Sequence, residues 1–248
     1  MKLPYTARTV TLAVCAAIGL AAQVDRTRFG VNQTFRLYYT NGSFGLRAQG
    51  VSELQEGHSK YYPLPQSSFD DYARLRPAAF RTNPFKRAGY DRKEWIGPHE
   101  FDESRLWFGK QFYDAEGMRG VGAFGYFDAE TREYRLWSPP EVADYEVRSM
   151  LVEPDRIWLG LDSFGEDIST SPGGLVSWDR ETHVARRYEL EFVVTEISRR
   201  GESLYLGTPG GYAILNGETV QRFRLRKDKN GLTRNVPVDR FPPGPSHY

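Results

Sequence analysis

The chain has 248 residues, enough for one large domain or two small ones. Apolar residues make up 40% of it, which is enough to fill a core and argues against a disordered chain. Its 33 basic and 32 acidic residues leave a formal net charge of +1, so no overall field attracts nucleic acid or an anionic membrane. Aromatic residues at 14%, together with 24 Gly and 15 Pro, favour strands joined by tight turns over helices.

Residues 1–22 differ in kind from the rest of the chain. Lys2 and Arg8 precede an apolar run at 10–20, and small residues follow it. This pattern predicts a cleaved signal peptide and export to the periplasm or the cell exterior. Because the run is too short for a comfortable span, we expect no stable membrane span after cleavage. An uncleaved anchor is the alternative.

The only cysteine, Cys15, lies inside this segment. The mature chain would therefore contain no disulfide and no structural thiolate metal site.

From residue 31 onward the chain carries a repeat, which is loose in its first copy, at 31–64. There, Leu37-Tyr38-Tyr39 is expected to be an aromatic strand and Phe44-Gly45-Leu46 to begin the following strand, with Tyr62-Pro63-Leu64 ending the unit. Residues 65–93 interrupt the pattern. Ser68, followed by two aspartates and later by Pro77, predicts one short capped helix in this insertion.

The repeat is clear in three further units, at 94–137, 145–190 and 192–225. Each contains an aliphatic, an aromatic and a bulky apolar residue followed by Gly, at 106–109, 157–160 and 204–207. A pair of small residues comes next, then a turn that opens with Asp128, Asp179 or Asn216 and reads D/N-x-E-T. An aromatic-x-Leu strand closes each unit, at Tyr134, Tyr188 and Phe223.

Each unit is expected to form four short strands. The Asp or Asn that opens the turn can accept hydrogen bonds from the backbone two residues on. The central aromatic residues, Trp107, Trp158 and Tyr205, are predicted to pack between neighbouring sheets, and the Gly two residues later to let backbones approach closely. About four such units predict an all-β, propeller-like fold of four-stranded antiparallel blades at 23–225.

The repeat resembles the blades of the two-component-regulator type of β-propeller, which run roughly L-W-x-G-T-x-x-G-L…D…Y. The segment at 204–212, LYLGTPGGY, is the closest match, and the likeness covers about residues 94–225. The resemblance implies a ligand-sensing role, since blades of this family form sensor regions of membrane proteins with seven or more blades. It is confined to the blade repeats, without a kinase or transmembrane part. With about four units, the alternatives are a small closed propeller, an open fragment, or a ring completed by another subunit.

The last stretch, 226–248, is polar and rich in proline, and most of it is expected to be extended or loose.

Two long insertions offer the one argued binding site. The third clear unit has only two residues between its aromatic strand and its Gly pair, whereas the first two have twelve, at 110–121 and 161–172. Both loops should emerge on one face, and loops on a rigid scaffold are where binding residues concentrate. A tolerated surface insertion is the alternative. The candidate ligand-binding residues are Lys110, Phe112, Tyr113, Asp114, Glu116, Arg119, Asp162, Phe164, Glu166 and Asp167.

His99 occupies the position that Met150 and Ile197 hold in the other units. It is either a functional polar residue near the propeller axis or a core histidine with a hydrogen-bond partner.

Known catalytic signatures are missing. There is no G-x-S-x-G elbow, phosphate-binding Gly-rich loop or H-E-x-x-H helix. We expect no cofactor and no metal site, with Ca²⁺ at 162–167 as a weak alternative. The leading hypothesis is an exported binding or interaction protein for a carbohydrate or protein ligand, without nucleic acid. The alternatives are a secreted hydrolase or lyase acting on polysaccharide or peptide, and a structural repeat that assembles into a larger ring.

Overall fold

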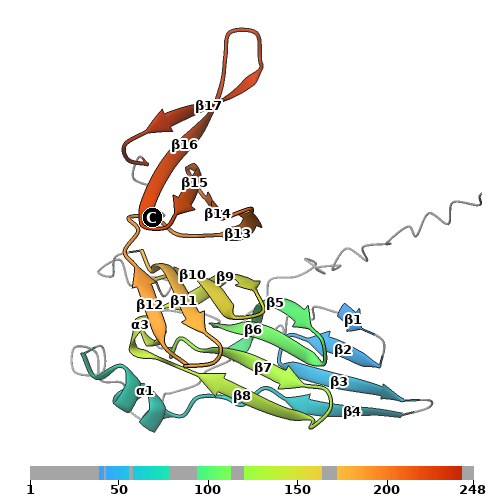
Figure 1. Ribbon diagram of the computed structural model, residues 1–248. Coiled ribbons are helices and arrows are strands. Elements are labelled where there is room, and N and C mark those ends of the chain that lie inside the picture. The colour runs from blue at the N-terminus through green and yellow to red at the C-terminus, as the bar shows by residue number, and fades with distance from the viewer. Residues whose placement is uncertain are drawn as a thin grey trace, which may run out of the picture.

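The computed structural model describes residues 39–41, 43–55, 58–78, 94–112, 120–163 and 172–241. Nearly all of the regular structure in these residues is β, in four antiparallel sheets whose strands follow chain order (Figure 1). The predicted all-β, propeller-like fold of about four units is confirmed. Among the described residues, no helix is long and apolar enough to cross a membrane.

Each sheet is built from consecutive strands. The first sheet contains β1 (Tyr39–Asn41), β2 (Phe44–Arg47), β3 (Gly50–Gln55) and β4 (His58–Pro63). The second contains β5 (Glu94–Asp102), β6 (Arg105–Phe112), β7 (Phe124–Asp128) and β8 (Glu133–Trp137). The third contains β9 (Glu146–Val152), β10 (Arg156–Asp162), β11 (Gly174–Asp179) and β12 (Ala185–Tyr188). The fourth contains β13 (Glu196–Arg200), β14 (Ser203–Thr208), β15 (Gly211–Asn216), β16 (Thr219–Lys227) and β17 (Thr233–Val238).

The sheets stack face to face in a row, and an apolar core fills each junction. One core joins the first and second sheets, another the second and third, and a third the third and fourth. Figure 1 shows the blue first sheet at one end of this row and the red fourth sheet at the other. Strand β9 lies beside both β5 and β13, so the first strands of successive sheets line one side of the row.

The aromatic strand of the repeat is the second strand of its sheet in chain order, β6, β10 or β14. Trp107 and Trp158 are 3% and 5% exposed and pack at the junctions that follow their sheets. A Cβ on Gly109 would lie 2.3 Å from Val147 of the third sheet, and one on Gly160 would lie 2.4 Å from the Val194 carbonyl oxygen before the fourth. The glycines therefore allow close approach of successive sheets.

Strand pairing corrects the sequence alignment in two of the units. In the second sheet, Phe124 pairs with Trp137, as Leu175 pairs with Tyr188 and Tyr212 with Phe223. Trp137, three residues after the expected Tyr134, is therefore the equivalent aromatic residue. The hairpins at 128 and 179 each enclose four residues, so the equivalent aromatic residue follows the turn-opening Asp at the same distance in both sheets, at Trp137 and Tyr188. In the fourth sheet Asn216 pairs directly with Thr219 around Gly217, so Phe223 comes earlier.

In the first sheet, the sequence alignment was wrong by one strand. Phe44–Arg47 forms the second strand, and Gly50 begins the third. Gly50 and Gly211 occupy equivalent positions, and at both a side chain would clash with the backbone of the next strand. A Cβ on Gly50 would lie 2.3 Å from the Tyr62 carbonyl oxygen, and a Cβ on Gly211 would lie 2.1 Å from the Phe223 carbonyl oxygen. Leu37 and Tyr38 lie outside the described residues, and Tyr39 begins β1.

The segment after 225 is more ordered than its composition suggests. Strand β16 extends to Lys227, and β17 pairs with it as a fifth strand. Asp228 organises the connecting turn by accepting hydrogen bonds from the amides of Asn230 and Leu232. Pro237 is tolerated because β17 is an edge strand, where a missing N–H need not break a ladder.

Arginines link each sheet to the one before it. Arg132 donates two hydrogen bonds to Glu53, at 2.8 and 3.1 Å, across the first junction. Arg180 donates to Asp102 at 2.6 Å across the second. Arg199 binds both oxygens of Glu153 at 2.7 Å across the third. Paired bonds of this kind fix relative orientation as well as adding energy.

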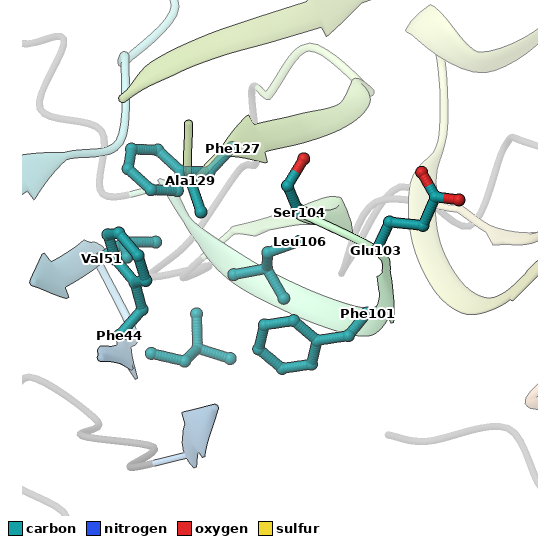
Figure 2. A pocket seen from close by; sticks show the side chains of 9 residues that line it. Phe44, Val51, Phe101, Glu103, Ser104, Leu106, Phe127 and Ala129 are labelled. Atoms are coloured by element: carbon teal, nitrogen blue, oxygen red, sulfur yellow. The ribbon is translucent and has the colours of Figure 1, made fainter. Parts of the chain in front are cut away.

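A small apolar cavity of about 40 Å³ lies at the first junction. Figure 2 shows the rings of Phe44, Phe101 and Phe127 around it, with the Glu103 carboxylate pointing away. The space is about the size of one or two waters and lacks converging polar groups, so it is a packing gap rather than a ligand site.

Candidate functional site: a groove beside helix α1

The insertion after the first sheet forms the predicted capped helix, α1 (Phe69–Leu75). The Ser68 hydroxyl accepts a hydrogen bond from the Asp71 amide, and the Asp71 carboxylate accepts one from the Ser68 amide. This reciprocal capping box satisfies two donors at the helix start. The hydrogen bonds that the Asp71 carboxylate accepts from the Ser68 amide and from Arg74 lower its pKa from 3.8 to about 2.

A groove of about 550 Å³ lies between α1 and the second and third sheets. Its volume falls within the range of small-molecule sites. Its described lining combines aromatic rings, polar side chains and short connecting segments: Pro65, Gln66, Ser67, Asp71, Arg74, Leu75, Lys110, Ala123, Leu136, Trp137, Ser138, Pro139, Trp178 and His183.

One wall is aromatic. The ring centroids of Trp137 and Trp178 are 5.8 Å apart, and the His183 ring stacks on Trp178 at 5.6 Å with an interplanar angle of 12°. His183 is also 5.5 Å from Trp137. Trp178 is buried, Trp137 half-buried and His183 exposed, so the cluster reaches from the core to the surface.

The D-x-E-T turn places His183 in this wall. The Asp179 carboxylate accepts hydrogen bonds from the amides of Glu181 and Thr182, as the sequence predicts for a turn-opening aspartate. The chain then turns back at His183, whose φ of 59° lies in the left-handed region. Non-glycine residues rarely adopt this conformation, although histidine does so more readily than most. The equivalent turn of the second sheet places Arg132 at φ 61°.

The opposite wall is polar and comes from the insertion. Arg74 donates to Asp71 at 2.8 Å on the surface of α1. Gln66 donates to the Leu64 and Glu94 carbonyl oxygens and accepts from the Glu94 amide, which fixes the approach to the helix. This wall therefore presents both hydrogen-bond donors and acceptors.

A buried ion pair lies at the base of the groove. The Lys110 ammonium is 2.7 Å from the Glu94 carboxylate, and their side chains are 2% and 0% exposed. Lys110 also donates to the Pro65 carbonyl oxygen at 2.6 Å, and Glu94 accepts from the Ser67 amide at 2.8 Å. A buried pair is stable only when further hydrogen bonds satisfy it, and these contacts supply them.

The sequence predicted that Lys110 lies in an exposed loop, and this is wrong. Lys110 belongs to β6 and is buried, because the strand runs to Phe112 before the chain leaves the sheet. Asp162 is the last residue of β10, and its carboxylate accepts from Arg148 at 3.1 Å. Phe112, also a predicted site residue, ends β6. The remaining predicted loop residues lie outside the described part of the chain: Tyr113, Asp114, Glu116, Arg119, Phe164, Glu166 and Asp167.

His99 lies on β5 opposite Phe108, as Met150 lies opposite Leu159 and Ile197 opposite Leu206. Strand pairing therefore agrees with the sequence alignment at this position. His99 is half-buried, and its Nδ1 is 3.0 Å from the Gly97 carbonyl oxygen, beside an irregularity in the β5–β6 ladder. It does not line the groove, and both predicted roles stay predictions.

Of the predicted ligand-binding residues, Lys110 lines the groove, and the residues of its aromatic wall were not predicted. This wall comes from a strand end and a turn that had been assigned only architectural roles. The sequence held one signal, at the fifth residue of the turn. This left-handed position holds His183 instead of glycine or asparagine, which raises the question of what the His183 side chain does.

The described residues give little support for a metal site or for acid–base catalysis in the groove. No group of three or more His, Cys, Asp or Glu side chains there could hold a metal ion. Burial raises the pKa of Glu100, whose carboxylate accepts from the Val152 amide at 2.7 Å. Glu100 does not line the groove, however, so it is not placed to act on a ligand there.

Comparison with known proteins gives only distant likenesses. No protein-family model and no curated protein match the chain. Matching solved structures include the extracellular domain of BT4673 from B. thetaiotaomicron, described once as a one-component system and once as a hybrid two-component system. In both cases identity is 16% and the TM-score 0.42, and the match covers 77% of this chain and 22% of the other. This chain thus spans about a fifth of that protein's solved domain, and at this TM-score the likeness carries no argument about function.

Proposed function

We propose that this protein is an exported binding protein whose groove beside α1 binds a polar ligand with an apolar face, of which an oligosaccharide is the class we favour. The observation that supports this most is the pairing of an aromatic wall with a wall of hydrogen-bonding side chains across a groove of about 550 Å³.

The two walls suit a sugar for physical reasons. A pyranose ring has an apolar C–H face, which can lie against Trp137 and His183, and a rim of hydroxyls. Those hydroxyls both donate and accept, so they can pair with the Arg74 guanidinium and the Asp71 carboxylate. Sites of this type combine apolar rings with a few well-placed polar groups.

The base of the groove adds preorganisation. The Lys110–Glu94 pair ties β5 and β6 to the segment that leads into α1 through the contacts of Pro65 and Ser67. A wall that is already fixed loses little freedom when a ligand binds, which lowers the cost of association.

Export, and a binding role for the two long loops, stay predictions from the sequence, and the groove depends on neither. We do not propose an enzymatic activity, because no observation in the groove specifically favours one.

The test is a thermal-shift and calorimetry screen of the purified protein against neutral and uronic-acid oligosaccharides. A ligand at 100 times its dissociation constant stabilises the native state by about 2.7 kcal/mol, which raises the melting midpoint measurably.

Two variants then locate the site. His183→Gly removes the ring yet suits the left-handed backbone, and Arg74→Gln removes the charge from the polar wall. Each should weaken binding by about fivefold or more, as when a side chain contributing ~1 kcal/mol is lost. Val184→Ala and Arg226→Gln, exposed residues outside the groove lining, are the matched controls. Binding that is unaffected by the groove variants, or a folded protein that binds nothing in the panel, would overturn the proposal.

A further inference from the structure

Successive sheets meet in one recurring way. We call the face of a sheet that is turned toward the next sheet along the chain its forward face, and the opposite one its back face. Strand pairing defines three equivalent forward-face positions: Phe44, Val51 and Tyr62; Trp107, Phe124 and Trp137; Trp158, Leu175 and Tyr188; and Tyr205, Tyr212 and Phe223. In the first three sheets these side chains pack in the core of the following junction.

The fourth sheet has the same forward face without a described sheet against it. The rings of Tyr205 and Tyr212 stack with centroids 6.4 Å apart, and those of Tyr212 and Phe223 with centroids 5.0 Å apart. All three are half-buried, whereas Phe124 and Leu175, the equivalents of Tyr212, are fully buried. Leu225 is 58% exposed, but the equivalent Leu64 and Leu190 are 2% and 6% exposed.

The fourth sheet also keeps the glycine of the repeat, Gly207. Its equivalents Gly109 and Gly160 are needed because the next sheet comes within 2.3–2.4 Å of where a Cβ would be. The three atoms nearest to a Cβ on Gly207 all belong to Glu196 of its own sheet, the nearest at 2.9 Å, and none of them belongs to another sheet. Glycine inside a strand costs stability and packs nothing. The fourth sheet therefore keeps the glycine of the other junctions, although no described sheet approaches it there.

Among the described sheets, the first has a back face that no other described sheet covers. Leu54 occupies the position of Phe127, Trp178 and Leu215, as pairing through β2–β3 shows. Those three are 1%, 4% and 3% exposed, whereas Leu54 is 42% exposed and Tyr61 on the same face is 43% exposed. Figure 1 shows the first sheet at the other end of the row from the fourth, and no described core cluster joins the two.

From these faces we infer that the protein associates head to tail, with the forward face of the fourth sheet of one copy packed on the back face of the first sheet of a second copy. The occupant is a sheet of this same chain because every described junction joins a forward face to a back face, and the described residues of each copy leave one face of each kind uncovered. Two fourth sheets facing each other would instead bring together two Arg200 guanidiniums, each 4.9 Å from the Tyr205 ring on that face. Such a head-to-tail contact is heterologous, so it yields a ring if it closes and a filament if it does not.

The test is sedimentation velocity of the purified protein over a wide concentration range, with two charge variants. Tyr212→Lys disrupts the forward face and Leu54→Lys the back face. Each alone should weaken self-association by about tenfold or more. A mixture of the two should form a dimer that stops at two subunits, because each variant retains the face that the other has lost. Leu232→Lys, at a residue 60% exposed on the β16–β17 turn, is the control, and circular dichroism checks that each variant folds.

Wild-type protein that stays monomeric at all concentrations would overturn the inference. So would association that Leu54→Lys leaves unchanged, because forward faces would then be packing on each other or on something else. Neither result bears on ligand binding in the groove, which lies at the second and third sheets.

Discussion

The third and fourth sheets are built from the same repeat but have different surroundings. Both carry the apolar-aromatic-apolar-Gly strand and a small-residue pair. In the third sheet, Trp158 is buried in the core of the next junction and its indole donates to Glu153 at 2.8 Å. In the fourth, Tyr205 is half-buried on a face without a described neighbour. The repeat therefore specifies the sheet, and burial of its aromatic residue depends on whether another sheet follows.

The largest expected effect comes from truncating the aromatic residue of each sheet. Trp158→Ala should destabilise the protein by about 3–5 kcal/mol, because it leaves a cavity in a packed junction. Tyr205→Ala should cost about 1 kcal/mol in the monomer, since the ring has less packing to lose. Urea unfolding of both variants measures the difference. Equal losses would mean that the two sheets are equally covered.

The next effect comes from adding a methyl group at the equivalent glycines. Gly160→Ala should cost about 2 kcal/mol, because its Cβ would clash with the Val194 carbonyl oxygen across the junction. Gly207→Ala should cost the monomer less, because the atoms nearest to its Cβ belong to Glu196 of the same sheet, the nearest at 2.9 Å, and none to another sheet. The unfolding midpoints of the two variants, measured at low protein concentration, check this contrast.

The first junction should weaken in acid. Hydrogen bonds from Arg132 and Tyr62 lower the pKa of Glu53 from 4.5 to about 2. A carboxyl whose folded pKa lies below its unfolded pKa stabilises the fold above the unfolded value, and that stability is lost as pH falls through the folded value. We therefore expect a loss of stability between pH 4.5 and about 2 that Glu53→Gln removes. Thermal melts across this range test it, and an unchanged slope in the variant would exclude the pair as the cause.

The smallest expected effect has the opposite sign. Burial raises the pKa of Glu100, so its ionised form opposes folding at neutral pH. Glu100→Gln keeps an acceptor for the Val152 amide and removes the charge, so it should raise stability at pH 7. The gain should vanish near pH 4, where the native carboxyl is protonated. A variant that is less stable at pH 7 would show that the hydrogen bond outweighs desolvation.

The architecture could be predicted from the sequence because the same local pattern of residues occurs in several units of the repeat. The turn-opening Asp128 and Asp179, the Gly after each aromatic and the Ser68 cap all act over a few residues, and all appear as expected. The looser copy at 31–64 was shifted by one strand because Phe44-Gly45-Leu46 resembles the start of a third strand. Only pairing with β3 shows it to be the second.

The groove was harder to predict because it depends on contacts between distant segments. Lys110 and Glu94 are 16 residues apart and Lys110 and Pro65 are 45 apart, and nothing local to Lys110 marks it as buried. Lys110 was predicted to lie in a solvent-exposed loop from the number of residues between two motifs. Such a count cannot show where the preceding strand ends. His183 was likewise seen only as part of a turn, since the stacking partner Trp178 faces it across a hairpin.

Strand β17 limits how copies of this protein can join. It is the outer edge of the fourth sheet, where unpaired backbone groups would ordinarily template another strand. Pro237 lies within it and offers no N–H, so a continuous ladder cannot extend past this point. Edge-to-edge growth into an open-ended cross-β array is thereby blocked. The head-to-tail association inferred above would use the aromatic face of the fourth sheet and would leave this edge strand free of pairing.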